Sequence, residues 1–214
     1  MDEIAIISTP ISEAWPMWLM FFLLLCVVLA EVLQPGSMRL AFRTAFTRLE
    51  RTFGDRANNF MSRLLLNIFR VGTLAMSLYL YSYQNAPFSM LTYCYIVLLI
   101  MAGVFVKMML TWLVSYTFEM RRSTTVFLPQ YDNLWTILCV MLYPLNLLYI
   151  NLSDGTLIYW TSFVAAALFV GLLMFKLLQN FYTGPRSLLY LLLYILTLEF
   201  VPFGAIVFSV VSIS

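Results

Sequence analysis

The stretch that decides the fold covers residues 15–51 and reads WPMWLMFFLLLCVVLAEVLQPGSMRLAFRTAFTRLER. Its first part, residues 15–33, is apolar apart from one glutamate and is long enough for a helix to cross about 30 Å of hydrocarbon. The part that follows contains four arginines, Arg39, Arg43, Arg48 and Arg51. An apolar span that leads directly into a basic segment is typical of a membrane helix whose second end faces the cytoplasm.

The composition of the whole chain indicates the same class of protein. Of the 214 residues, 63% are hydrophobic and 10% are charged, whereas a soluble domain is about half apolar and a quarter charged. Because a water-soluble fold could not bury that much apolar surface, we predict an all-α membrane protein with a single domain over residues 1–214. The net charge of +2 is small and the basic residues lie beside apolar segments, so we expect contact with the lipid bilayer and none with nucleic acid.

The 12 Lys and Arg residues gather at alternate breaks between the apolar segments. The first, third and fifth breaks are basic, while the second and fourth breaks and both termini carry no Lys or Arg. Cytoplasmic loops are enriched in these residues, so the alternation predicts six transmembrane helices with both termini outside the cytoplasm. The predicted spans cover residues 15–33, 63–83, 88–117, 134–151, 156–178 and 187–210.

A further helix is expected in the basic segment, at residues 37–53. Its apolar residues follow each other at spacings of four, three and four, which places them on one stripe: Phe42, Phe46, Leu49 and Phe53. A basic amphipathic helix beside a span typically lies in the membrane interface, and packing beneath the helical bundle is the other interpretation. In the interfacial arrangement four arginines would contact lipid headgroups: Arg39, Arg43, Arg48 and Arg51. Lys107 and Lys176, late in inward-running spans, are expected to extend to the same headgroups.

Glu199 is the acidic residue that lies deepest in a predicted span. It follows Arg186 by thirteen positions, which corresponds to roughly 20 Å along a helix. An ionised carboxylate at that depth must be paired, hydrated or protonated. Glu199 is therefore either a proton- or ion-binding group or a structural anchor, and Arg70 is its natural partner, although the Arg70 guanidinium could instead extend to the headgroups.

Few residues of the chain are suited to catalysis or metal binding. It contains no His, and its three cysteines lie inside apolar runs. Metal centres need His, Cys or carboxylate ligands at suitable spacing, and hydrolytic or phosphotransfer sites have motifs that are equally lacking here. We therefore predict a protein without enzymatic activity, cofactor or bound metal.

The last predicted span carries a distinctive pattern. Residues 194–202 read YILTLEFVP, and the positions that define the pattern are Tyr194, Thr197, Leu198, Glu199 and Pro202. This Tyr-x-x-Thr-Leu-Glu-x-x-Pro core resembles the last helix of a family of Bacteroidota membrane proteins known only as a domain of unknown function. Its members also resemble this chain in their apolar first span and their Arg- and Phe-rich cytoplasmic stretch. The resemblance implies an inner-membrane protein of a bacterium with two membranes, and it implies no activity. In such a cell the termini that the Lys and Arg pattern places outside the cytoplasm would lie in the periplasm.

Two main hypotheses about function follow, beside a third in which the protein is an enzyme that acts on a lipid-linked substrate, for which the sequence offers no evident catalytic base. The first is a non-enzymatic membrane subunit or assembly partner of an envelope complex, which associates with other membrane proteins or with itself. The second is a small proton- or cation-coupled transporter that uses Glu199, with Arg70 as its counter-ion.

Overall fold

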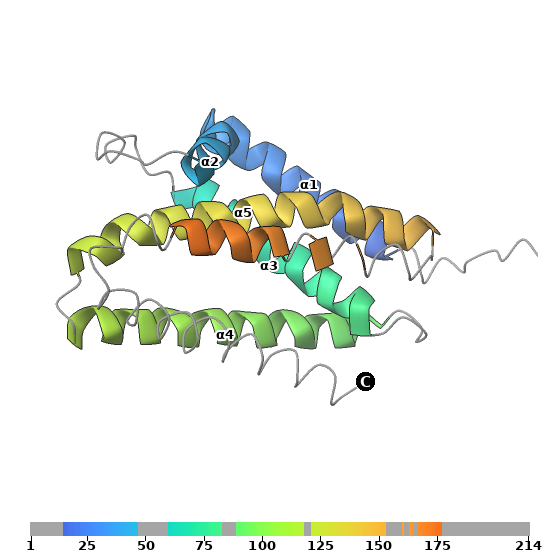
Figure 1. Ribbon diagram of the computed structural model, residues 1–214. Helices are drawn as coiled ribbons and strands as arrows, with labels where there is room; N and C mark the ends of the chain where they lie inside the picture. The colour runs from blue at the N-terminus through green and yellow to red at the C-terminus, as the bar shows by residue number, and fades with distance from the viewer. Residues whose placement is uncertain are drawn as a thin grey trace, which may run out of the picture.

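The structure is a computed structural model that describes residues 15–46, 60–82, 89–117, 121–152, 160, 163–164 and 167–176. The regular structure in this part of the chain is entirely helical (Figure 1). The helices are α1 (Trp15–Leu33), α2 (Ser37–Phe46), α3 (Phe60–Ser82), α4 (Met90–Thr117) and α5 (Arg121–Leu152), followed by a short apolar helix at Ala167–Lys176.

Four of the described helices are long and apolar enough to cross a membrane. The spans within them are Trp15–Leu33, Phe60–Tyr81, Met90–Trp112 and Gln130–Asn151. They coincide with the first four predicted spans, and the all-helical class is confirmed for the described residues. The predicted fifth span is described mainly at its second half, by Ala167–Lys176, and the predicted sixth span lies outside the described residues.

The main difference from the predicted boundaries is at α5. The span was expected to begin at residue 134, whereas the helix begins at Arg121. Polar residues such as Asp132 and Asn133 end an apolar run without ending a helix, because the helical backbone satisfies its own hydrogen bonds whatever the side chains are. Residues 130–133 therefore lie on the same helix as the apolar residues that follow them.

α1 packs on α3 through one narrow stripe. Its buried residues recur every three or four positions: Met20, Leu23, Cys26 and Ala30. On α3 the contact is made by Gly72, where an added Cβ would lie 2.5 Å from Leu23 Cδ2. A residue without a side chain at this position is what allows the two helices to approach so closely.

α3 lies between α1, α4 and α5 and connects them (Figure 1). Its end and the beginning of α4 are joined by a hydrogen bond of 2.5 Å from the Ser89 N–H to the Tyr79 hydroxyl. Further along, the Tyr93 hydroxyl donates to the Gly72 carbonyl at 3.3 Å. From the first pair to the second, the residue number rises on α4 and falls on α3. The two helices are therefore antiparallel and form the hairpin that their short connection predicts.

α2 begins at Ser37, the residue at which the amphipathic helix was predicted to start. It is described as far as Phe46, so the second half of the predicted helix lies outside the described residues. Ala41 is buried against the bundle, while Phe42 is 40% exposed. The interfacial position of this helix stays a prediction.

Candidate functional site

A group of side chains with polar atoms lies where α3 meets α5. The members of this α3–α5 seam are Asn67, Arg70, Thr73 and Ser77 of α3, and Asp132, Cys139 and Asn146 of α5. The residue numbers increase together on both helices, so α3 and α5 run in the same direction. A polar contact between neighbouring spans stabilises a helix pair because lipid offers no other hydrogen-bonding partner.

Arg70 forms the charged end of the α3–α5 seam. Its Nη1 atom lies 3.3 Å from Asp132 Oδ1 and donates to the Asp132 backbone carbonyl at 3.0 Å. Its Nη2 atom donates to Asn67 Oδ1, and its Nε atom donates to the Leu66 carbonyl at 3.4 Å. Side chains on a helix point toward its N-terminus, which explains why the guanidinium lies one turn back from its own Cα. All three guanidinium nitrogens are thus engaged by described residues.

The two partners of the Arg70–Asp132 ion pair differ in how far their side chains are exposed. The Arg70 side chain is 13% exposed and the Asp132 side chain is 63% exposed. The carboxylate therefore faces the surroundings of the bundle, while the guanidinium is enclosed by α3 and α5. Such a pair pins two helices together, and the exposure of the acid reduces the energetic cost of burying charge.

Asn146 forms the neutral part of the seam. Its Nδ2 atom donates to the Thr73 carbonyl at 3.2 Å, and its Oδ1 atom lies 3.0 Å from the Ser77 hydroxyl. That hydroxyl also lies 3.0 Å from the Thr73 carbonyl. Among the described residues the buried Thr73 hydroxyl has no hydrogen-bond partner. The amide thus links two parallel helices, a role that polar residues commonly have inside membranes.

A second cation, Lys107 of α4, lies against aromatic rings of α5. Its Nζ atom contacts the Tyr131 hydroxyl and lies 3.7 Å from the centroid of the Tyr131 ring. The Trp135 ring centroid is 6.0 Å away. The faces of these rings carry negative partial charge and attract the ammonium group. Lys107 therefore joins α4 to α5 from within the bundle.

The predicted site residues differ in where they lie. Arg39 and Arg43 are exposed on α2, and Arg48, Arg51 and Glu199 lie outside the described residues. Lys107 packs on aromatic rings, and the Lys176 side chain is 0% exposed. Headgroup contacts for these two lysines, and a contact between Arg70 and Glu199, stay predictions.

Asp132 is the residue that the sequence reasoning missed. It belongs to a polar run, residues 130–133, that was assigned to the connection before the fourth span. Its position in the first turn of the span Gln130–Asn151 follows only once α5 is known to begin at Arg121. The signal in the sequence was an acidic residue directly before one predicted span, together with an arginine inside another predicted span.

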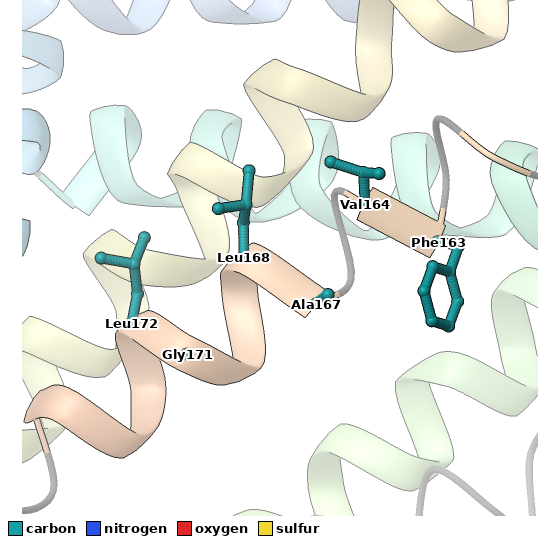
Figure 2. A pocket seen from close by; sticks show the side chains of 6 residues that line it. All are labelled: Phe163, Val164, Ala167, Leu168, Gly171 and Leu172. Atoms are coloured by element: carbon teal, nitrogen blue, oxygen red, sulfur yellow. The ribbon is translucent and has the colours of Figure 1, made fainter.

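The described surface also has one apolar depression, of about 440 Å³, over the short helix Ala167–Lys176. Figure 2 shows the side chains that line it, Phe163, Val164, Ala167, Leu168, Gly171 and Leu172. None of these residues carries a polar side chain, whereas substrate sites combine apolar walls with a few polar groups that fix orientation. Within the described ranges no three His, Cys, Asp or Glu residues gather as metal ligands would.

The fold and the seam define an all-helical protein with several apolar helices of membrane-spanning length, linked internally by polar side chains. Residues 17–209 match the family described as Domain of unknown function (DUF4271), and the chain belongs to that family. The resemblance to an uncharacterised family is thereby confirmed, while the bacterial group stays a prediction. No curated protein and no solved structure matches the chain.

Proposed function

We propose that this protein is a non-enzymatic subunit or assembly partner of a membrane complex in the bacterial envelope. The observation that carries the proposal is the outward face of α4. This helix is attached to the bundle along one side, and the opposite side presents a continuous apolar surface that is suited to another membrane helix.

The two sides of α4 are distinguished by burial. Tyr93, Ile96 and Ile100 are buried against the rest of the bundle. On the outward face, four large apolar residues at intervals of seven are exposed: Leu91 at 81%, Leu98 at 68%, Phe105 at 60% and Trp112 at 66%. A repeat of seven keeps one stripe of a helix facing a partner helix over several turns.

The chemistry of this face also supports a protein partner. The charge that α4 carries within its span, Lys107, is directed toward α5 and leaves the outward face uncharged. Met101, Met108 and Met109 are exposed beside the heptad positions. Methionine and aromatic residues are enriched where proteins bind one another, because they bury large areas and adapt to irregular surfaces.

The proposal includes the finer topology. The chain crosses the inner membrane six times, with both termini in the periplasm and α2 in the cytoplasmic interface. The four membrane-length helices and the alternation of Lys and Arg along the sequence support this arrangement.

The geometry of Arg70 supports a subunit over the alternative, a proton- or cation-coupled transporter that uses Glu199. In that mechanism Arg70 would exchange partners with Glu199 during transport. Arg70 has Asp132 as its carboxylate partner, and each of the three nitrogens of its guanidinium donates a hydrogen bond, to Leu66, Asn67 and the Asp132 carbonyl. A Glu199→Gln variant tests the alternative, which requires the loss of a pH-dependent flux at unchanged membrane abundance.

Site-specific photo-crosslinking tests the proposal directly. A photoreactive residue at Leu98 is expected to capture a defined protein partner at fixed stoichiometry after extraction in mild detergent. The matched control is the same residue at Val28, which is exposed to a similar degree on α1 and is expected to yield no such product. A monomer that forms no protein adduct from Leu98 or Phe105 would refute the proposal.

A further inference from the structure

The corner between α1 and α2 is closed by one side chain. The Glu31 carboxylate accepts hydrogen bonds from the Gly36 N–H at 2.6 Å, the Ser37 hydroxyl at 2.6 Å and the Met38 N–H at 3.0 Å. Gly36 has a φ of +86°, a left-handed conformation that favours glycine. An acid of α1 thus satisfies the free N–H groups at the beginning of α2, which fixes the direction in which α2 leaves α1.

α2 uses one face to dock and leaves the other face open. Ala41 is buried against the bundle, whereas Arg39, Phe42 and Arg43 are exposed. Arg39 is three residues from Phe42 and four residues from Arg43, so the three side chains lie on the same side of the helix, with Arg39 between the other two. The open face therefore combines positive charge with an apolar group.

α3 contributes a further arginine at the same end of the bundle. The Ser62 hydroxyl donates to the Ala30 carbonyl at 3.1 Å, which places the beginning of α3 beside the end of α1. Arg63 follows on the next residue and is exposed. Figure 1 draws α2 at this end, where α1 ends and α3 begins. We refer to Arg39, Arg43 and Arg63 as the basic rim.

Both acidic residues in the described ranges are engaged by other groups. They are Glu31, which is bound to the beginning of α2, and Asp132, which pairs with Arg70. Neither Arg39 nor Arg63 has a carboxylate partner among the described residues. The basic rim lies at the ends of two membrane-length helices, Trp15–Leu33 and Phe60–Tyr81, which is the level of the lipid headgroups.

We propose that the basic rim binds the phosphate groups of anionic phospholipids and that Glu31 is the positioning residue for this surface. Guanidinium groups bind phosphate through paired hydrogen bonds. Phe42 would insert at the boundary between headgroups and acyl chains, where aromatic rings are favoured. This lipid-binding surface is separate from the outward face of α4 and does not depend on the subunit function.

Native mass spectrometry of the full chain tests the lipid preference. The detergent-solubilised protein is offered equimolar phosphatidylglycerol and phosphatidylethanolamine, and the retained ratio is measured. The wild type is expected to retain phosphatidylglycerol preferentially, and an R39Q/R63Q variant is expected to reduce that preference by about 5-fold for each arginine removed. The charge-preserving control R39K/R63K should retain most of the preference. Equal retention of both lipids by the wild type, or an unchanged preference in R39Q/R63Q, would overturn the proposal.

A Glu31→Gln variant separates positioning from charge. This variant makes the protein more positive, so attraction by net charge alone would strengthen the binding of phosphatidylglycerol. We expect a severalfold weaker preference instead, because the amide nitrogen of glutamine is not an acceptor and α2 loses part of its anchor. Circular dichroism and thermal unfolding check that the bundle is intact, and Ser37→Ala, which removes one of the bonds to Glu31, serves if Glu31→Gln does not fold. A stronger preference for phosphatidylglycerol in either folded variant would refute the role of Glu31.

Discussion

The two sides of α3 are held to the bundle by different kinds of contact. Toward α1 the contact depends on shape, because Gly72 leaves space for Leu23. Toward α5 the contact depends on polar groups, with Arg70 on Asp132 and Asn146 on the Thr73 carbonyl. One helix therefore uses two independent means of association within the same hydrophobic surroundings.

The difference shows what holds membrane helices together. Lipid tails are as apolar as leucine side chains, so burying an apolar residue between two spans gives little driving force. Close packing and hydrogen bonds remain as the sources of attraction. Repulsion between atoms rises steeply at short distance, whereas a lost hydrogen bond costs a limited amount. The α1 side of α3 should therefore be more sensitive to substitution than the α5 side.

The largest effect is expected from Gly72→Leu. A Cβ at this position would lie 2.5 Å from Leu23 Cδ2, and a leucine adds three further carbon atoms, so the Leu23 side chain, or α1 with it, would have to move away from α3. We expect a loss of about 3 kcal/mol in the free energy of unfolding, which is the upper part of the usual range for overpacking. Reversible unfolding in mixed micelles of mild detergent and SDS would measure it.

Gly171→Leu is the matched control for this variant. An added Cβ at Gly171 meets no atom within 4 Å, so the same change of residue is expected to alter stability by less than about 0.5 kcal/mol. A similar loss in both variants would show that leucine is unfavourable in these helices for reasons other than the contact with α1.

An intermediate effect is expected at the charged end of the α3–α5 seam. Arg70→Gln should cost about 2 kcal/mol, because it removes the ion pair and the hydrogen bond to the Asp132 carbonyl together. In a double-mutant cycle with Asp132→Asn we expect a coupling of about 1 kcal/mol, since the acid is 63% exposed and the pair is partly solvated. The coupling should decrease as salt is added.

A coupling near zero in this cycle would change the interpretation of Arg70. The pair with Asp132 would then contribute nothing to stability, and Arg70 would be available to another carboxylate. That result would favour the transporter hypothesis, in which Glu199 is the partner.

The sequence was sufficient to predict the four membrane-length helices that the structure describes and the α3–α4 hairpin, and insufficient to predict which polar side chains join α3 to α5. The length and apolar character of residues 15–33 predicted α1, because crossing a bilayer sets a minimum length for a helix. The fourth span was predicted to begin at residue 134, whereas the membrane-length part of α5 begins at Gln130 and the helix itself at Arg121. An apolar run shows which part of a helix is suited to lipid, whereas the helix itself can extend beyond that run into polar residues.

The partners of the polar residues were the part that the sequence did not reveal. The contact between Arg70 and Asp132 depends on how α3 and α5 are rotated about their axes, and an almost uniformly apolar span carries little periodic pattern from which that rotation can be read. The role of Glu31 depends similarly on Gly36, whose left-handed conformation turns the N–H groups of α2 toward the acid. Both contacts arise from three-dimensional geometry that the spacing of residues does not determine.

The smallest effect is expected at the neutral part of the seam, from Asn146→Leu. This variant removes the hydrogen bond from the Asn146 amide to the Thr73 carbonyl. The Thr73 carbonyl still has the Ser77 hydroxyl within hydrogen-bond distance. Hydrogen bonds between membrane helices contribute about 0.6 kcal/mol on average, and we expect a loss of that size. The matched control is Asn151→Leu on the same helix, because the Asn151 amide donates to the Leu147 carbonyl of α5 itself and joins no second helix. In mixed micelles the free energies of unfolding of the two variants should therefore differ by about 0.6 kcal/mol. Equal stability of both variants would mean that packing, and not the Asn146 amide, holds this part of α5 on α3.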